Sequence, residues 1–229
     1  MTYILHDLRA ADGRSFSPFC WRARMALEHK GLAYELRKVR FTDIASIGHE
    51  ARTVPVLFDG DTVVRDSWDI ALYLDEKHPE APRLFPTEGD RRFAQFMLHW
   101  AAPQVHLPIF RSFVADIWDA LDPADQPYFR TSREARLGGT PLEQMRETQG
   151  AHLAQARANL APVRAVLQQQ AFLGGSQPVF ADYIVFGALQ WARVIGKTQV
   201  LEPSDTAVSA WFERCLDLHG GVARREPAA

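Results

Sequence analysis

Cysteine is scarce in this chain of 229 residues, in which Cys20 and Cys215 are the only two. Two cysteines are too few for a disulfide framework. The opening stretch MTYILHDLRAADG also lacks the apolar segment of a secretory signal. We therefore expect a protein that works in a reducing cytoplasm.

Long apolar runs and an excess of one charge are missing as well. No uninterrupted apolar run approaches the roughly 18 residues that a membrane-spanning helix needs. Basic and acidic residues are interspersed and leave a net charge of −2, so there is neither a cationic surface for nucleic acid nor a polybasic segment for a membrane. The eight histidines form no two-histidine helical motif with a supporting carboxylate, and we predict no metal site. Small molecules or other proteins are the expected partners.

The first 80 residues carry both strand and helix signals. Pro18 and Gly31 bound a helix, and Asp59-Gly60 is a strong signal for a two-residue hairpin. Strands are expected at 3–7, 34–39, 54–58 and 62–65, with helices at 18–30 and 67–77. This order predicts an α/β domain, in which helices lie on a small mixed sheet.

Strand signals disappear beyond Gly89, where apolar residues recur at helical spacing. We predict an all-α second domain over 89–229, with residues 81–88 as the linker after a first domain of residues 1–80. Pro103 and Pro108 should break or kink a helix, and the turn-rich stretch 121–139 predicts a surface loop. Asp182 is interpreted as structural: it can sit in the first turn of a helix, although Val179 cannot supply the usual side-chain cap.

Ser17 stands where the first helix should begin. Serine is a good N-cap, and the unpaired amides and positive dipole end of the helix would stabilise an anion beside it. A thiolate is the anion of interest, because a free thiol with a pKa of about 8.5 is only ~3% ionised at pH 7, whereas a pKa of about 6.5 makes it ~75% ionised. An ordinary helix cap remains the alternative.

Two further features lie at the same predicted sheet edge. Val54-Pro55 opens a strand; it is either an edge-strand start or a cis peptide that leaves the backbone of Val54 free for an extended ligand. Asp66-Ser67 either caps the next helix or presents a carboxylate, a hydroxyl and free amides to a zwitterionic ligand. Their common location favours a ligand site over three separate structural features.

At these positions the chain resembles the glutathione S-transferase superfamily over nearly its full length. The matching features are the serine in S-P-F-C-W-R-A-R, the Val-Pro pair and the Asp-Ser pair. The resemblance implies a thioredoxin-like N-terminal domain, an all-helical C-terminal domain, glutathione as cosubstrate and a homodimer. Within the superfamily, the segments Y-F-R-T-S-R-E-A-R-L-G-G and F-L-G-G-S-Q-P-V-F-A-D-Y resemble bacterial glutathione-dependent β-etherases and related fungal transferases.

The resemblance also implies a role for each site residue. Ser17 would donate a hydrogen bond to the glutathione thiolate, helped by the amides of Phe19 and Cys20. The cysteinyl backbone of glutathione would lie on Val54, beside Pro55. Its γ-glutamyl group would lie on Asp66 and Ser67, and its glycyl carboxylate near Arg52 or Arg40.

An aromatic electrophile would require an aromatic pocket. In the helical domain the candidate residues are Trp100, His106, Phe110, Phe113, Trp118 and Trp191, of which we expect about two to touch substrate, since most aromatic residues at helical spacing are core. Phe16 or Phe19 could close the pocket from the other side. His106 is either an acid for a departing phenoxide or an ordinary histidine.

Three functions follow. The thiolate would attack an aromatic electrophile, with cleavage of lignin-derived β-aryl ethers as a specific case. The alternatives are a zeta-like isomerase, which regenerates glutathione, and a non-catalytic protein that binds glutathione or hydrophobic ligands. A disulfide reductase is disfavoured: Cys20 occupies the second position of a C-x-x-C pattern, but the serine in the first position cannot attack a disulfide.

Overall fold

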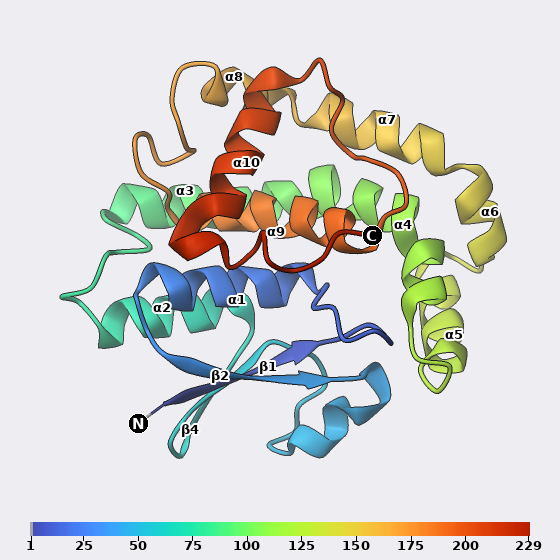
Figure 1. Cartoon of the computed structure of the whole chain (residues 1–229), viewed down its shortest axis with the longest axis horizontal. Coiled ribbons are helices and arrows are strands. Elements are labelled where there is room, and N and C mark those ends of the chain that lie inside the picture. Colours follow the sequence, from blue (N-terminus) through green and yellow to red (C-terminus); the bar gives the residue numbers. More distant parts are fainter. Residues whose placement is uncertain (1) are drawn as a thin grey trace.

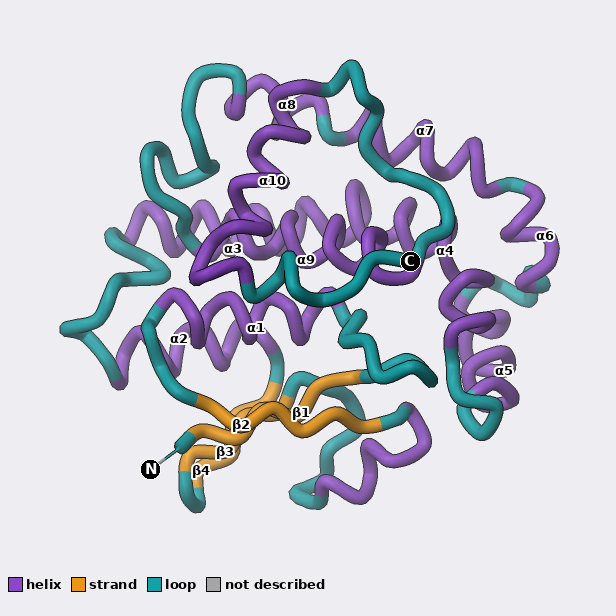
Figure 2. The backbone as a smooth tube through the Cα atoms, viewed as in Figure 1, coloured by secondary structure: helices purple, strands orange, loops and turns teal. Residues whose placement is uncertain are grey.

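The N-terminal part is built on a four-stranded mixed sheet, as the sequence predicts. In the computed structural model, which describes residues 2–229, the strand order is β2-β1-β3-β4. β1 pairs parallel with β2 and antiparallel with β3, and β3 pairs antiparallel with β4. The elements are β1 (Tyr3–Leu8), α1 (Pro18–His29), β2 (Tyr34–Val39), the 3-10 helix η1 (Phe41–Ile47), β3 (Val56–Asp59), β4 (Thr62–Arg65) and α2 (Ser67–Lys77). Helices α1 and α2 lie together over one face of the sheet (Figure 1, Figure 2).

Local sequence signals account for most of these boundaries. Pro18 occupies the first turn of α1, and Gly31 follows its end with a φ of 66°, the left-handed region that glycine adopts without steric cost. β3 and β4 form the hairpin predicted at Asp59-Gly60. These local choices agree with the packing, because the middle of α1 is buried, including Trp21, which is fully enclosed.

The C-terminal part is helical, which confirms the predicted combination of a thioredoxin-like domain with an all-α domain. Its elements are α3 (Glu88–Ala101), the π-helical turn η2 (Ala102–His106), α4 (Leu107–Ala120), α5 (Gln126–Arg136), α6 (Leu142–Glu147), α7 (Gln149–Asn159), α8 (Ala161–Leu167), α9 (Phe180–Ile195) and α10 (Thr206–Gly221). Residues 78–87 contain no helix or strand, and we propose the domain boundary within them. No helix of the described chain is long and apolar enough to cross a membrane.

The prediction of a loop over 121–139 is wrong, because α5 occupies its middle. Pro127 lies in the first turn of this helix, where its missing amide costs nothing, and Gly138 and Gly139 follow the end with positive φ. The turn residues at both ends made this stretch resemble a loop. The helix itself is short, and Phe129 is its one buried side chain.

Pro103 and Pro108 do not break the chain into separated helices. The helix instead changes locally to π-helical geometry between α3 and α4. Pro103 lies within the π-helical turn η2, which joins α3 to α4, and Pro108 lies in the first turn of α4. Such a turn carries one extra residue and shifts the faces of the helix that follow it.

Helix α9 lies in the middle of the molecule (Figure 1). Nearly all of its residues are buried. It packs against α1 at Gly187, where an added Cβ would lie 2.5 Å from the carbonyl oxygen of Pro18. Only glycine permits this close approach. The start of α1, with Ser17 at its cap, is therefore fixed by contact with the helical domain.

Asp182, in the first turn of α9, has the structural role expected of it. Its carboxylate accepts hydrogen bonds from the amides of Val179 (3.0 Å) and Leu173 (2.7 Å) and from the indole N–H of Trp211 (2.9 Å). The valine side chain has no acceptor to complete a reciprocal cap, as the sequence indicated. Burial raises the pKa of Asp182 to about 6.

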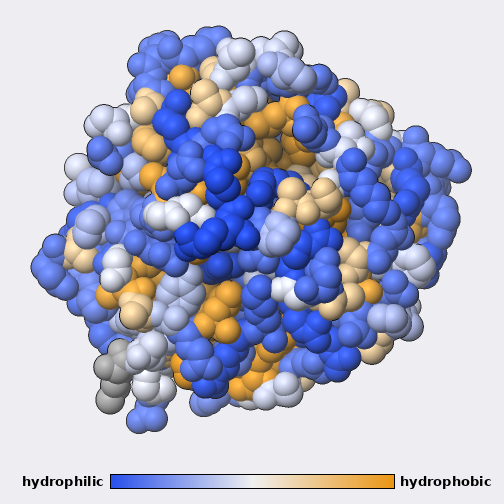
Figure 3. Space-filling view, in the orientation of Figure 1, coloured by the Kyte–Doolittle hydropathy of each residue, from blue (hydrophilic) through white to orange (hydrophobic). Residues whose placement is uncertain are grey.

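Polar and charged side chains cover most of the face seen in Figure 3, and the apolar side chains on it form separate patches. The large apolar side chains are instead gathered in a core that runs through both parts of the chain.

Candidate functional site

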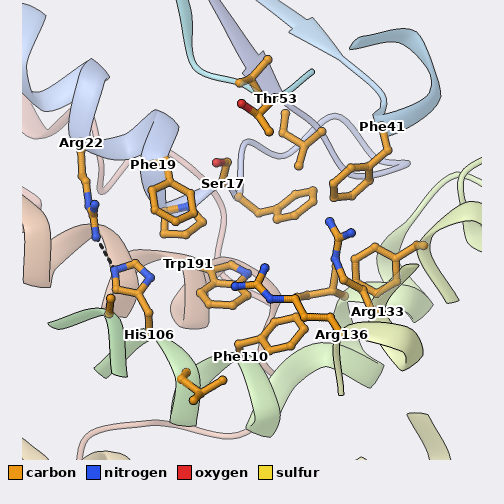
Figure 4. Close-up of a pocket in the computed structure, with 18 of the residues that line it drawn as sticks. Ser17, Phe19, Arg22, Phe41, Thr53, His106, Phe110, Arg133, Arg136 and Trp191 are labelled. Carbon is orange, nitrogen blue, oxygen red and sulfur yellow. Dashed lines mark hydrogen bonds between the residues drawn. The ribbon is translucent and has the colours of Figure 1, made fainter. Parts of the chain in front are cut away.

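A cavity of about 530 Å³ lies between the N-terminal and helical parts of the molecule (Figure 4). Its N-terminal wall includes residues 16–19 and 52–54 and two residues of η1, Phe41 and Ile44. Its helical wall is formed mainly by His106, Phe110, Ile117, Tyr128, Phe129, Arg133, Arg136 and Trp191. The cavity therefore joins the predicted ligand edge of the sheet to an aromatic surface of the helical part.

Ser17 lines this cavity as the N-cap of α1. Its Oγ accepts a hydrogen bond from the Cys20 amide at 3.3 Å, which leaves the hydroxyl proton free to donate. Within the described chain, the Phe19 amide has no acceptor and no base contacts the Ser17 hydroxyl. Two donors at the positive end of a helix suit a bound anion, whereas a serine nucleophile would need a neighbouring base.

Phe19, Arg22 and His106 form a stacked group beside Ser17 (Figure 4). The rings of Phe19 and His106 stack with centroids 5.5 Å apart, and the Arg22 guanidinium lies 4.9 Å from the Phe19 centroid. Arg22 donates to Nε2 of His106. Burial lowers the pKa of Arg22 to about 10, against the opposing charge of Asp66. The group forms a fixed edge of the cavity.

His106 is poorly suited to act as an acid. The ring is buried, and its Nε2 must accept the proton of Arg22, because a guanidinium has no acceptor. Burial, followed by the charge of Arg22, places the pKa of His106 well below its usual range. This histidine is therefore neutral at physiological pH, which favours the ordinary role over proton donation to a phenoxide.

The Val54-Pro55 peptide bond is cis, and Val54 lines the cavity. Neither the amide nor the carbonyl of Val54 has a hydrogen-bond partner within residues 2–229. The neighbouring Arg52 is exposed, lines the cavity and has no carboxylate within 4 Å in the same range, whereas Arg40 is bound to Asp43 through two hydrogen bonds. Arg52 is consequently the better of the two candidates for a ligand carboxylate.

Asp66 and Ser67 lie at the start of α2 and are not among the lining residues, although the charge of Asp66 acts on the lining residue Arg22. Asp66 is the N-cap, since its carboxylate accepts from the Trp68 amide at 2.7 Å. Its φ of 69° lies in the left-handed region, which a non-glycine residue adopts only when the surroundings enforce it, often at a binding site. Ser67 is buried. The capping role and the ligand role of this pair are compatible, because Asp66 is exposed.

Three of the six helical-domain candidates line the cavity, namely His106, Phe110 and Trp191, and Phe16 and Phe19 line it from the N-terminal side. Trp100, Phe113 and Trp118 are not among the lining residues. Trp100 faces away from the cavity because it follows the lining residue His99 by one position, or about 100° of rotation. Phe113 is fully buried, and its ring lies against Gly196 at the end of α9.

Several contributors to the cavity were not found in the sequence, and three of them matter most for its chemistry. Phe41 comes from η1, and Arg133 and Arg136 come from α5, the helix hidden in the expected loop. The buried carboxylate of Asp125 ties these two segments together by accepting from the amides of Phe41 and Thr42, both at 3.0 Å. An aspartate just before a proline-containing first turn was the available signal for this helix start.

Cys20 is fully buried in the core beneath the site. Burial, with the nearby charge of Asp7, raises the pKa of its thiol well above the usual range. A thiol in this state is not reactive, which agrees with the argument against disulfide exchange.

Two family models match this chain. The glutathione S-transferase N-terminal domain matches residues 16–77, and the glutathione S-transferase C-terminal domain matches residues 93–218. Together they span most of the sequence, and the protein belongs to the glutathione S-transferase family.

Individual relatives are similar over part or all of the chain. Glutathione S-transferase Z2 of Arabidopsis thaliana is 35% identical over 102 residues, 39% of this chain and 45% of that protein. A probable maleylacetoacetate isomerase of Vibrio cholerae is 38% identical over 85 residues, 34% of this chain and 39% of that protein. These matches therefore span less than half of either relative. The crystal structure of glutathione transferase GSTFuA3 from Phanerochaete chrysosporium has a TM-score of 0.76 and 29% identity, covering 96% of this chain and 92% of the other.

Proposed function

We propose that this protein is a serine-type glutathione transferase, in which Ser17 stabilises the thiolate of glutathione. The observation that carries the proposal is the open end of α1 at the cavity. There a hydroxyl proton and the Phe19 amide have no protein acceptor in the described part of the chain. Hydrogen bonds to the ionised form lower a thiol pKa, and the helix dipole acts in the same direction.

Glutathione would lie along the sheet edge. Its cysteinyl backbone would pair with the free amide and carbonyl of Val54, beside Pro55. Its γ-glutamyl ammonium would meet the exposed Asp66, and Ser67 would contribute backbone or hydroxyl contacts. Arg52 would hold the glycyl carboxylate.

The thiolate would attack an electrophilic carbon held against the aromatic wall of Phe110 and Trp191, whose rings stack 6.3 Å apart. A carbon–sulfur bond forms, and the bond to the leaving group breaks with its electron pair. In the specific case of a β-aryl ether next to a ketone, the leaving group is a phenoxide. The resemblance of the α5 segment to β-etherases supports this case.

A zeta-like isomerase is the second candidate, favoured by the names of the relatives from Arabidopsis thaliana and Vibrio cholerae. The same thiolate would add to a double bond and later leave, so glutathione would be regenerated. An aryl transfer or ether cleavage instead consumes one glutathione in each turnover.

The test compares the wild-type protein with Ser17→Ala and with Ser15→Ala. Ser15 is a matched control, since its hydroxyl is buried outside the cavity and has no partner in the described structure. Ultraviolet difference absorbance would follow the thiolate of bound glutathione, and a fluorogenic α-keto β-aryl ether would report phenol release together with adduct formation.

We expect Ser17→Ala to lower the turnover rate about 10- to 100-fold near neutral pH and to raise the thiol pKa, with Ser15→Ala close to wild type. Phenol release with stoichiometric adduct would support the etherase case. Turnover without loss of glutathione would instead identify the isomerase. Glutathione binding without any turnover would leave the non-catalytic binder, and an unchanged thiol pKa in Ser17→Ala would refute the role of Ser17.

A further inference from the structure

The charged side chains that line the cavity are all of one sign. Its lining includes four arginines and no aspartate or glutamate, in a chain whose net charge is −2. Arg22 is bound to His106, and Arg52 lies on the sheet side, where the proposal above places a glutathione carboxylate. Two cations, Arg133 and Arg136, remain on the opposite wall and have no assigned function.

Arg133 contacts aromatic rings and has no counter-ion among the described residues. Its guanidinium lies 4.8 Å from the ring centroid of Phe129 and 5.1 Å from that of Phe41, which holds the cation between two aromatic faces. Its one hydrogen bond within residues 2–229 goes to Ser132 Oγ, and no carboxylate lies within 4 Å. Burial, reinforced by the charge of Arg136, lowers its pKa. Desolvating an unpaired cation is costly, and an anionic ligand would offset that cost.

Arg136 lies one turn further along α5. Its guanidinium is 5.4 Å from the ring centroid of Phe110, which stacks in turn on Trp191. It has no hydrogen bond or ion pair with any described residue. Figure 4 shows the Arg133 side chain pointing toward Phe41, and the Arg136 side chain crossing Phe110 toward Trp191.

The contrast with Arg130, on the same helix, shows that unpaired arginines are not general on α5. Arg130 lies outside the cavity lining and binds Glu143 at 2.7 Å and Glu134 at 3.0 Å. Acidic partners are therefore present around this helix and are absent where it faces the cavity.

We infer that Arg133 and Arg136 form an anion subsite, and that the electrophile is an aromatic compound carrying a carboxylate. The ring would lie against Phe110 and Trp191, and the carboxylate would accept hydrogen bonds from the two guanidinium groups. This inference rests on the proposed transferase function, because it names the substrate class of the same site.

The test uses a matched pair of electrophiles, a chloronitrobenzoate with chlorine para to the carboxylate and the corresponding neutral benzamide. In both, the thiolate forms a carbon–sulfur bond, the carbon–chlorine bond breaks, and chloride leaves. Each enzymatic kcat/KM is divided by the uncatalysed rate constant with glutathione, since the two rings differ in intrinsic reactivity. The acid-to-amide ratio of these values measures recognition of the carboxylate.

We expect the ratio to fall about 10-fold in Arg133→Gln and in Arg136→Gln, and further in the double variant, mainly through KM for the acid. Arg133→Lys should restore part of the loss, and Arg130→Gln should stay within about twofold of wild type. A ratio that the double variant leaves unchanged would overturn the inference. So would an equal fall in kcat for both electrophiles, which would indicate stabilisation of a leaving group.

Calorimetric binding of the two product conjugates separates this inference from the proposed function. If the wild type conjugates neither electrophile, the transferase assignment fails, and binding still decides the subsite. The acid conjugate should bind about 10-fold more tightly than the amide conjugate, with the difference lost in the double variant. Equal affinities in the wild type would overturn the subsite even if both electrophiles were turned over.

Discussion

Two parts of the cavity lining, one from each domain, are stabilised by different kinds of contact. Within the N-terminal wall, we call Phe16, Ser17 and Phe19 the α1 wall. Within the helical wall, we call Tyr128, Phe129, Arg133 and Arg136 the α5 wall.

Two of the three residues of the α1 wall are buried, since Phe16 is 3% exposed and Ser17 is 4% exposed, whereas the Phe19 ring is 42% exposed. The backbone of this segment is held by contacts from several directions. The preceding Ser15 donates its amide to Glu226 near the C-terminus at 2.8 Å, and its carbonyl accepts from the Trp21 indole at 2.9 Å. On the other side, Gly187 of α9 packs directly against Pro18 in the first turn of α1.

The α5 wall has fewer anchors. One side chain of α5, Phe129, is buried, and Tyr128 is half exposed. Its connection to the rest of the cavity depends on the carboxylate of Asp125 and on arginine–aromatic contacts. The two walls would therefore have different functions. The α1 wall, which would activate the thiol, is held firmly in place. The α5 wall, which would select the electrophile, can accept substitutions with little loss of fold stability.

The largest expected effect comes from breaking the α1 wall with Gly187→Ala. The added Cβ would meet the Pro18 carbonyl at 2.5 Å and would force α1 away from α9. We expect a loss of about 3 kcal/mol in the free energy of unfolding, with weaker stabilisation of the glutathione thiolate. Urea unfolding and thiolate absorbance measure the two effects.

Gly150→Ala is the matched control for this substitution. Gly150 lies in α7, and an added Cβ there meets no atom within 4 Å. The helix should gain about 0.5–1 kcal/mol from the exchange. Equal stability of the two alanine variants would show that the contact between α1 and α9 is not tight.

Asp125→Ala should loosen the α5 wall and leave the α1 wall intact. The substitution removes the acceptor for the Phe41 and Thr42 amides and for the Thr42 hydroxyl, which donates at 2.7 Å. We expect a loss of about 2 kcal/mol in stability and a several-fold rise in KM for the electrophile, with glutathione affinity within about twofold of wild type.

Asp122→Ala controls for the loss of an aspartate in the same segment, because Asp122 is more exposed and accepts a single backbone hydrogen bond, from Ala124. Its effect on both substrates should be small. If Asp125→Ala weakened glutathione binding as much as electrophile binding, the two walls would not be independent.

The sequence was sufficient for the fold wherever local signals and packing agreed. Pro18, Gly31 and the Asp59-Gly60 turn define element ends by backbone chemistry alone, and these elements lie where they were predicted. Helix α5 was missed for the opposite reason. Its flanking turn residues dominate the local pattern, and the contacts that stabilise it, through Phe129 and Asp125, come from segments distant in the sequence.

The sequence predicted the site residues of the N-terminal wall better than those of the helical wall. Ser17 and Val54 lie on the cavity because they occupy the ends of elements that local signals place well. Which face of a long helix points inward is a tertiary property, so Phe110 and Phe113 could not be distinguished from periodicity alone. The π-helical turn η2 adds to this ambiguity, because its extra residue shifts the faces of α4 relative to α3.

The smallest expected effect is a change in stability with pH, which should differ between the two walls. At the far end of α1, His29 Nδ1 lies 2.7 Å from the Tyr183 hydroxyl, which lies 3.0 Å from Nε2 of His219. Burial, followed by the charges of His219 and Lys30, lowers the pKa of His29 to about 4. A histidine in the unfolded chain has a pKa of about 6.5 and binds the proton more readily. His29 therefore contributes stability that is present above about pH 6.5 and is lost as the pH falls toward 4.

Between pH 7 and pH 5 these two pKa values lead us to expect that His29 accounts for a loss of ~1.8 kcal/mol in the free energy of unfolding. His29→Asn keeps a hydrogen-bonding group near Tyr183 and removes the titration, so its unfolding should depend less on pH; adding His219→Asn should reduce the dependence further. Hydrogen exchange at pH 5 should show faster opening at the end of α1 and in α10, with α5 unchanged, because the charged groups that line the α5 wall are arginines, which stay protonated across this range. Equal acceleration in α5 would mean that acid loosens the whole molecule and that the two walls do not differ in this respect.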